Sequence, residues 1–366
     1  MSQPTTRRAS HPYHMYEAMQ GQPDAFARTA ERAGAGLRPH IPRIAGAERL
    51  FVVGIGTSYH AALIGEHLLR TYAGGVDARA VHAFDFALYG PALTPRDVVI
   101  GMSHRGTKRY TAASLGRAGD AGCFTVLVTG EGGAPGGARA DVTLKTVPQE
   151  ISSAHTISYS AAIGALAALA EQVGRHRTGA APLPPGFLAG EMPAALRTAL
   201  ETEPQAAAFA RAHVGRRRIW LVGGGPSAVT AQEAALKIKE SSYLQAEGMP
   251  VEAMLHGPFQ CIEADDLFVL VAPAGAAQAR VIEAAGEVEA LGAPFLVVGD
   301  GTAEALHRGA AGWWTVPAVP EPFTALTCVV PLQLFTYHLA LARGTNPDGF
   351  RLDDPRFARA YALIKL

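Results

Sequence analysis

The stretches VVGIGTS (residues 52–58) and LVGGGPS (residues 221–227) share one pattern, an apolar run followed by glycines and a serine, at an offset of 169 residues. Three further pairs of segments recur in the same order, with offsets that drift by only two or three residues. They are DVVIGMSHRG (97–106) with DLFVLVAPAG (266–275), CFTVLVT (123–129) with PFLVVGD (294–300), and DVTLKTVP (141–148) with WWTVPAVP (313–320). The common order indicates an internal duplication.

Each repeated segment is a short run rich in β-branched residues and flanked by Gly, Pro or Asp, which is typical of a strand buried on both faces. Helical patterns separate these segments, at 59–72, 108–119, 229–246 and 276–291. Alternating strands and helices favour a doubly wound, mostly parallel sheet with helices on both faces. The sequence therefore predicts two tandem α/β domains.

The chain of 366 residues is long enough for two domains of ordinary size. The stretch RHRTGAAPLPPGFLAGEM (175–192) combines Pro, Gly and charge and is typical of a join. The expected organisation is a helical arm, a first domain, a linker, a second domain and a C-terminal tail. The expected ranges are 1–34, 35–178, 179–205, 206–344 and 345–366.

The composition excludes several classes of protein. Lys plus Arg equals Asp plus Glu at 32 each, which argues against a general nucleic-acid or membrane surface. The three cysteines are widely spaced, and the N-terminus lacks the apolar run of a signal peptide. No uninterrupted apolar stretch has the length of a membrane span. We therefore expect a cytoplasmic protein, and the histidine spacing predicts neither a metal nor a cofactor.

Two loops follow predicted strands and precede predicted helices, where α/β sheets bind ligands. In GIGTS (54–58), Gly56 permits a tight turn, and Thr57 and Ser58 offer hydroxyls and amides; such a turn is also often only a turn. A dinucleotide fingerprint is not met, because Tyr59 stands where it requires Gly.

The second loop, SHRGTKRYT (103–111), gathers cations and hydroxyls around one glycine. The residues are Ser103, His104, Arg105, Gly106, Thr107, Lys108 and Arg109. A solvated basic surface is the ordinary interpretation of such a run. Its place beyond a buried strand, in an otherwise neutral chain, favours an anion site instead.

The helical segment AQEAALKIKESSYLQAEG (231–248) places Glu233, Lys237 and Glu240 on one stripe, at i, i+4 and i+7. An exposed Glu–Lys pair is common and worth little, so this spacing alone does not favour catalysis. Downstream, His256 precedes Gly257 and Pro258 in a turn, where a histidine is usually incidental.

Taken together, five motifs resemble a known family. They are GTSYHAA (56–62), SHRGTKRYT, EISSAHTISYS (150–160), QEAALKIKESSYLQAEG (232–248) and LHGPFQCIEADD (255–266). In this order they resemble the sugar-isomerase (SIS) domains of glutamine–fructose-6-phosphate amidotransferase. They also resemble its stand-alone relatives, which are deaminases, deglycases and ketose/aldose isomerases. The resemblance implies two tandem SIS domains.

The resemblance also implies roles for residues at the matching positions. Glu240 matches the base that moves a proton between C1 and C2, and Glu233 and Lys237 match its supporting pair. His256 matches a histidine that assists ring opening and comes from the partner subunit, which implies a homodimer with shared active sites. Ser58 and the loop 103–108 match the phosphate-binding turns, with Thr156 nearby.

Three departures from the family pattern bear on the substrate. First, no cysteine stands near the start, so we expect no glutaminase domain. Second, the family's loop reads SxSGET, whereas Arg105, Thr107 and Lys108 stand here, so the anion is a phosphate or another group such as a sulfonate. Third, the family's imine-forming lysine falls at Ala360, and Lys365 lies too far along to replace it.

The expected function is that of an aldose–ketose isomerase acting on a phosphosugar or a similar small anionic sugar. One alternative is an amino-sugar-phosphate deaminase or an Amadori-product deglycase, which uses the same proton transfer but expels an amine. The other is a non-catalytic sugar-phosphate-binding regulator, which needs the anion loops but not the acid.

Overall fold

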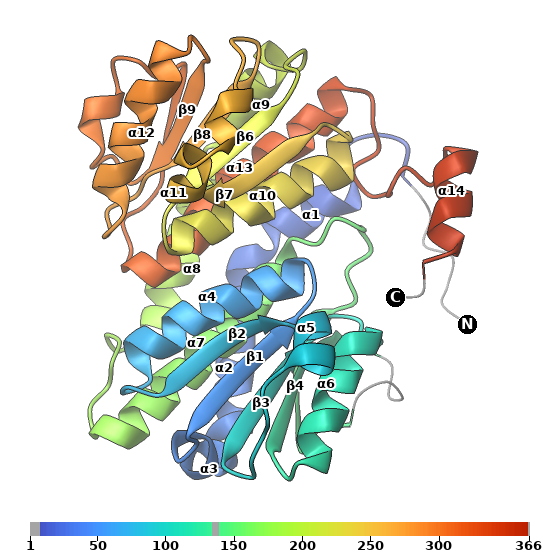
Figure 1. Cartoon of the computed structure of the whole chain (residues 1–366), viewed down its shortest axis with the longest axis vertical. Coiled ribbons are helices and arrows are strands. Elements are labelled where there is room, and N and C mark those ends of the chain that lie inside the picture. Colours follow the sequence, from blue (N-terminus) through green and yellow to red (C-terminus); the bar gives the residue numbers. More distant parts are fainter. Residues whose placement is uncertain (1–7, 134–138, 365–366) are drawn as a thin grey trace. The chain divides into compact units, whose positions relative to one another are not determined.

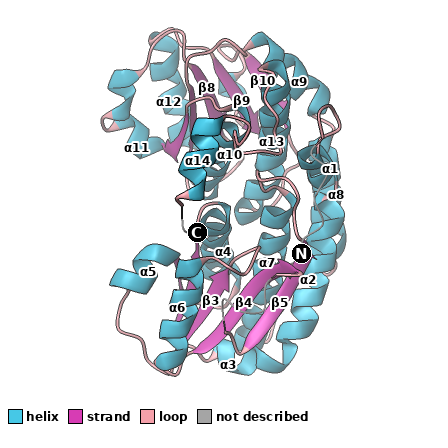
Figure 2. Cartoon of the chain, turned by 90° about the vertical axis from the view of Figure 1, so that its right-hand side faces the viewer, coloured by secondary structure: helices cyan, strands magenta, loops and turns pink. Residues whose placement is uncertain are grey.

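The structure, a computed structural model, describes residues 8–133 and 139–364 and divides into two compact units. Within the described residues, the first-repeat unit comprises 21–150 and 157–194. The second-repeat unit comprises 8–20, 151–156 and 195–364. Figures 1 and 2 show each unit as a sheet flanked by helices. The chain passes from one unit to the other more than once, so neither unit is one continuous segment.

The first-repeat unit is built on a five-stranded sheet of order β2-β1-β3-β4-β5, in which every neighbouring pair is parallel. Its strands are β1 (Arg49–Gly54), β2 (Asp77–His82), β3 (Asp97–Met102), β4 (Phe124–Glu131) and β5 (Val142–Pro148). β3 is buried at every residue and β1 at all but its first. The predicted burial of both strand faces is confirmed for β1, β3 and β4, whereas β5 keeps several residues partly or fully exposed.

Helices cover both faces of this sheet (Figure 1). They are α2 (Gln22–Leu37), α3 (Ile41–Ala45), α4 (Thr57–Tyr72), α5 (Ala83–Tyr89), α6 (Arg109–Asp120) and α7 (Ile157–Thr178). On one face, Phe51 packs with Phe86 of α5 and Leu115 of α6. On the other, α4 lies so close to α7 that a side chain on Gly65 would meet Leu166 Cδ1 at 2.4 Å. This is the expected doubly wound arrangement.

The second-repeat unit has a parallel five-stranded sheet of the same order, β7-β6-β8-β9-β10. Its strands are β6 (Ile219–Gly223), β7 (Ala246–Pro250), β8 (Leu267–Val271), β9 (Phe295–Gly299) and β10 (Gly312–Thr315). Its helices are α1 (His14–Gln20), α9 (Glu203–Ala212), α10 (Pro226–Ser242), α11 (Val251–Leu255), α12 (Gln278–Ala290), α13 (Thr324–Ala342) and α14 (Pro355–Ala362). α8 (Met192–Leu200) begins in the first-repeat unit and ends in this one.

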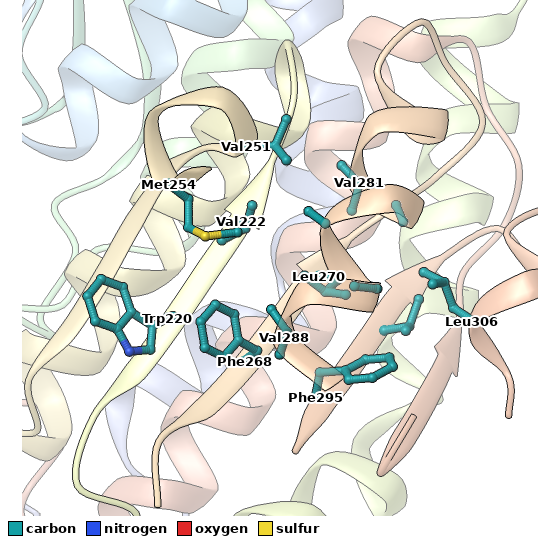
Figure 3. Packing of buried hydrophobic residues seen from close by; sticks show 14 of the residues in the cluster. Trp220, Val222, Val251, Met254, Phe268, Leu270, Val281, Val288, Phe295 and Leu306 are labelled. Atoms are coloured by element: carbon teal, nitrogen blue, oxygen red, sulfur yellow. The ribbon is translucent and has the colours of Figure 1, made fainter. Parts of the chain in front are cut away.

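One face of the second sheet carries the apolar cluster of Figure 3, in which Trp220 and Phe268 stack with ring centroids 6.1 Å apart. Val281 and Val288 of α12 belong to the same cluster. The buried side chains therefore come from strands and a helix that are far apart in the sequence.

The duplication extends to the backbone. Gly56 and Gly225, 169 residues apart, precede α4 and α10 with φ/ψ of 58°/−131° and 55°/−128°. A Cβ on Gly54 would lie 2.5 Å from Ser58 O, and one on Gly223 would lie 2.5 Å from Ser227 O. Both turns thus require glycine for the same two reasons, a positive φ and a close approach. The predicted repeat is confirmed.

Among the described residues, one helical stretch, Glu321–Ala342, is long and apolar enough to cross a membrane. Of its apolar window, 83% is buried inside the protein, where α13 packs against α10 and α9. A core helix has this composition for the same reason as a membrane helix, since it meets apolar groups on every side.

The predicted N-terminal arm consists of two helices that belong to different units. α1 belongs to the second-repeat unit and α2 to the first-repeat unit. The domain boundaries drawn from the sequence remain predictions, because the compact units are not continuous segments.

Candidate functional site

The turn after β1 brings Gly56, Thr57 and Ser58 to the start of α4. Ser58 N donates to Ile55 O at 3.2 Å, and the amides of the next two residues donate to Gly56 O. Thr57 and Ser58 remain partly accessible. Their hydroxyls therefore lie at the positive end of a four-turn helix, where an anion is stabilised.

The loop after β3 presents its cations to solvent. Its first turn is closed by a hydrogen bond of 3.0 Å from Gly106 N to Ser103 O, with φ of 73° at Gly106. Arg105 and Thr107 are exposed, and Lys108 is half-buried beside them. Burial and the neighbouring Arg105 guanidinium lower the pKa of the Lys108 ammonium. The second effect reflects two cations that lie close together, and neighbouring cations favour an external anion.

Ser103 lies beneath this loop, with only 3% of its surface exposed. Its hydroxyl has no hydrogen-bond partner among residues 8–133 and 139–364. Buried hydroxyls are normally paired, so this one is suited to a ligand or a water molecule.

His104 supports the loop rather than lining its surface. The His104 carbonyl accepts hydrogen bonds from Gly130 N (2.8 Å), Thr129 Oγ1 (3.1 Å) and Gln149 Nε2 (3.0 Å). Its ring Nε2 accepts one from Glu150 N at 2.9 Å. Burial, with a smaller contribution from Arg105, lowers the pKa of the ring to about 4. The Nε2 atom of the ring is therefore occupied by Glu150 N, and the role of His104 in substrate binding remains a prediction.

In the second-repeat unit, α10 brings the predicted stripe of charged residues together. The Lys237 ammonium lies 3.6 Å from Glu233 Oε1 and forms a hydrogen bond to Glu240 Oε2. The side chains of Glu233 and Lys237 are 0% and 1% exposed, whereas that of Glu240 is 20% exposed. The buried pair therefore holds one accessible carboxylate in place.

His256 lies far from this carboxylate within the unit. α10 begins where β6 ends and runs back along the sheet, so Glu240 lies about 21 Å along the helix from Pro226, at the edge where the strands begin. β7 then runs forward again, and α11 after it ends at Leu255, directly before His256. The ring is 78% exposed and lies 3.2 Å from Glu252 Oε2. Glu240 and His256 thus lie at opposite ends of the strands of one sheet, Glu240 where the strands begin and His256 where they end.

The second repeat has its own counterpart of the cationic loop, at residues 272–278 before α12. Here the chain supplies the acceptors: Ala276 N donates to Glu321 Oε1 and Ala274 N to Asp300 Oδ2, both at 3.0 Å. The remaining cavity has a volume of about 10 Å³, which is barely enough for one water molecule. This loop is closed by carboxylates of the same unit. Sequence reasoning missed both acids, because neither is near the loop in the sequence.

The remaining predicted positions are also placed. Thr156 is completely buried in segment 151–156, which belongs to the second-repeat unit. Ala360 lies on the exposed side of α14, and Lys365 lies outside the described residues. Within residues 8–133 and 139–364, no group of three or more His, Cys, Asp or Glu side chains is placed to hold a metal ion. The assignment of all these residues to a substrate site remains a prediction.

Solved structures with this fold cover almost the whole chain. The C-terminal domain of glucosamine-fructose-6-phosphate aminotransferase from Francisella tularensis has a TM-score of 0.82 at 21% identity, over 93% of this chain and 99% of that one. Tagatose-6-phosphate ketose/aldose isomerase from Escherichia coli gives 0.77 at 18%, over 94% and 97%. Glucosamine-6-phosphate deaminase from Thermotoga maritima gives 0.71 at 19%, over 92% and 96%.

Sequence comparison leads to the same group. Glutamine–fructose-6-phosphate aminotransferase (isomerizing) from Aquifex aeolicus is 29% identical over 301 residues, which are 82% of this chain and 50% of the relative. The chain thus spans about half the length of this relative. The model of the SIS domain family matches twice, at residues 43–172 and 214–343, once in each repeat. The chain therefore belongs to the SIS domain family, with two SIS domains that are homologous to the isomerase part of glutamine–fructose-6-phosphate aminotransferase.

Proposed function

We propose that the protein is an aldose–ketose isomerase that acts on a phosphosugar or a similar small anionic sugar. The observation that carries this proposal is the arrangement on α10, where the buried Lys237 holds the accessible carboxylate of Glu240. Membership of the SIS family and the fold shared with a tagatose-6-phosphate isomerase support it.

The proposed reaction moves one proton between neighbouring carbons. The Glu240 carboxylate takes the proton from the hydroxyl-bearing carbon next to the carbonyl and returns it to the former carbonyl carbon. Meanwhile the carbonyl oxygen gains a proton and the neighbouring hydroxyl oxygen loses one, so the carbonyl and hydroxyl groups exchange places. A positioned carboxylate can perform both transfers in turn. The ion pair with Lys237 fixes the direction of the carboxylate, and Glu233 holds Lys237 from the other side.

The anionic end of the sugar is assigned to the first-repeat unit. Hydroxyls and helix-start amides from the two loops, together with two cations, make a charge-assisted site. The residues proposed for it are Gly56, Thr57, Ser58, Ser103, Arg105, Gly106, Thr107 and Lys108. The guanidinium of Arg105 has a delocalised charge, which suits a phosphate or a sulfonate equally.

His256 is proposed to act on the sugar bound by a second copy of the chain. Within one unit the sheet separates His256 from Glu240, and the His256 ring is 78% exposed. A histidine that opens the sugar ring must reach the ring oxygen next to the base. A homodimer with shared active sites meets this condition.

A second candidate is an amino-sugar-phosphate deaminase, favoured by the shared fold with a glucosamine-6-phosphate deaminase. It uses the same base but releases ammonia. The two reactions are separated by incubating the protein with a panel of sugar phosphates and amino-sugar phosphates, while ammonia and ketose are both measured. Ketose without ammonia supports the isomerase, and ammonia release supports the deaminase.

The catalytic assignment is tested with Glu240→Gln, which keeps the shape of the side chain. We expect turnover to fall by about 10²–10⁴-fold, while stabilisation by sugar phosphate persists. Glu247→Gln, an exposed residue on β7, is the matched control and should retain full turnover. Unchanged turnover in Glu240→Gln would disprove the assignment. Binding without turnover in the unmodified protein would instead support a regulator.

The shared site is tested by mixing two inactive variants. Glu240→Gln and His256→Asn are expected to complement each other after co-expression, because a mixed dimer contains one site with both native residues. Half of the dimers are mixed and one of their two sites is intact, so about one quarter of the activity should return. No recovery in isolated mixed dimers would place both residues in one chain's site.

A further inference from the structure

Two non-glycine residues with positive φ occur among residues 8–133 and 139–364, and they touch each other. They are Tyr243 (φ 59°) and Arg351 (φ 54°). The Tyr243 hydroxyl donates to Gly349 O at 2.9 Å and accepts from Arg351 N at 3.0 Å. The Arg351 guanidinium lies 5.4 Å from the centroid of the Tyr243 ring. Left-handed backbone at such residues costs free energy and persists only where the surroundings hold it.

Tyr243 directly follows Ser242, the last residue of α10, and lies three positions after Glu240. The last carbonyls of a helix have no partner within it. Here Ser241 O accepts from Thr345 Oγ1 at 2.7 Å, and Ser242 O accepts from Arg343 Nε at 2.9 Å. The end of α10 that carries Glu240 is thus capped by the chain that follows α13. We call residues 343–351 the brace.

The brace is also tied to the other segments of its unit. The Asp348 carboxylate accepts from His14 N (2.9 Å) and Met15 N (2.8 Å), at the start of α1. The Asp348 carbonyl accepts from Ser153 N at 3.0 Å, and Asn346 Nδ2 donates to Arg8 O at 3.0 Å. The brace therefore links the last turn of α10 to α1 and to segment 151–156, which are distant in the sequence.

A glycine is the usual residue at a left-handed helix end, because it adopts this conformation without a Cβ clash. A tyrosine there is unfavourable for the helix itself. Its ring and hydroxyl, however, make the contacts to Gly349 and Arg351 that a glycine could not make. The contacts of the Tyr243 side chain to Gly349 and Arg351 therefore explain why the backbone of Tyr243 keeps its strained left-handed conformation.

We propose that Tyr243 is a positioning residue that clamps the brace onto the last turn of α10 and so fixes the place of the Glu240 carboxylate. The catalytic part rests on the proposed function, whereas the clamp itself does not. Small displacements of a reacting group reduce the rate strongly while substrate binding persists. The clamp thus predicts an effect on kcat rather than on KM.

The first test is Tyr243→Phe, which removes two hydrogen bonds and keeps the ring. Amide hydrogen exchange at Arg351 and its neighbours should become about fivefold faster, as expected for the loss of one hydrogen bond. On the sugar that the panel identifies, kcat should fall on the order of 10-fold to 10²-fold with KM unchanged. Tyr89→Phe, at a ring that is 77% exposed, is the matched control and should change neither quantity.

The second test, Tyr243→Gly, separates positioning from stability. Glycine relieves the backbone strain but abolishes the clamp, so kcat should fall at least as far as in Tyr243→Phe. The melting temperature should stay within about 4 °C of the unmodified protein. Unchanged exchange at Arg351 in Tyr243→Phe would overturn the clamp, and faster exchange with unchanged kcat would overturn the positioning role. If the unmodified protein turns over no sugar, the proposed function fails, and the exchange result still decides the clamp.

Discussion

The loop after β3 and the loop after β8 occupy equivalent places in the two repeats, but the first carries cations and the second carries no charge. Each precedes a helix, α6 at Arg109 and α12 at Gln278, exactly one repeat offset apart. The first loop carries Arg105 and Lys108 and faces solvent. The second consists of small residues, and Glu321 accepts from its amide. Helix-start amides at equivalent places thus face a proposed external anion in one repeat and an internal carboxylate in the other.

This difference indicates that the two repeats have different roles in the proposed function. A loop whose amides are satisfied internally has no need of cations, and none stand between residues 272 and 278. The second repeat instead carries the ion-paired glutamates of α10. The proposed anion site and the proposed base therefore arise from different copies of one ancestral unit.

The largest effect is expected from removing the two cations of the first loop. Arg105→Ala combined with Lys108→Ala should weaken the binding of fructose 6-phosphate and of inorganic phosphate by about 10²–10⁴-fold. Each charge-assisted contact contributes about 1.5–3 kcal/mol. Titration calorimetry measures the change, and Arg28→Ala, an exposed residue of the same unit, is the control. If the double variant bound both ligands as tightly as the unmodified protein, the cations of the first loop would not bind the anion, and the proposed difference between the two loops would be wrong.

An intermediate effect is expected from acid. The unfolded chain protonates His104 below about pH 6.5, whereas the folded unit does so only near pH 4, so stability falls as the pH decreases through this window. Between pH 7 and 5 the free energy of unfolding should fall by about 2 kcal/mol through this residue. Pro273, its counterpart in the second loop, does not titrate.

Chemical unfolding of His104→Gln at both pH values checks this prediction, because glutamine can still accept from Glu150 N. The variant should lose about 2 kcal/mol less stability than the unmodified protein over the same interval. An identical loss in both proteins would mean that other groups cause the acid sensitivity.

The smallest effect is expected from opening the second loop. Glu321→Ala leaves Ala276 N without its acceptor, and inorganic phosphate can then take its place. At phosphate concentrations of about ten times the dissociation constant, the variant should gain about 1.4 kcal/mol of stability beyond the gain of the unmodified protein. Glu304→Ala, an exposed neighbour, is the control. No additional stabilisation would show that the second loop has lost its affinity for anions.

The features that the sequence predicted correctly are those with a local period. The stripe of Glu233, Lys237 and Glu240 follows from helix geometry alone, and the repeated strands follow from their continuous apolar runs. β2 and β7 were missed because their residues alternate with charged or exposed ones or include Gly and Pro, as suits strands at the margin of the buried region.

The features that were missed depend on distant residues. The helix pattern was expected to continue to Ala246, but α10 ends at Ser242 because Tyr243 is held in left-handed conformation by Gly349 and Arg351. Likewise, the support of His104 by Glu150 N depends on segments 46 residues apart. Tertiary contacts of this kind leave no periodic signal in a single sequence.

The order in which the chain enters the two units has a consequence for its synthesis. The described part of the first-repeat unit ends at residue 194, whereas the second-repeat unit needs α1 as well as segments up to α14. At ribosomal rates of about 5–20 residues per second, α1 waits on the order of 7 to 30 s for α13 after residue 194 has been made. During this time the apolar side of α1, with Met15 and Met19, has no folded partner. We therefore expect the nascent chain to depend on a chaperone at this stage, and the first-repeat unit to become protease-resistant first.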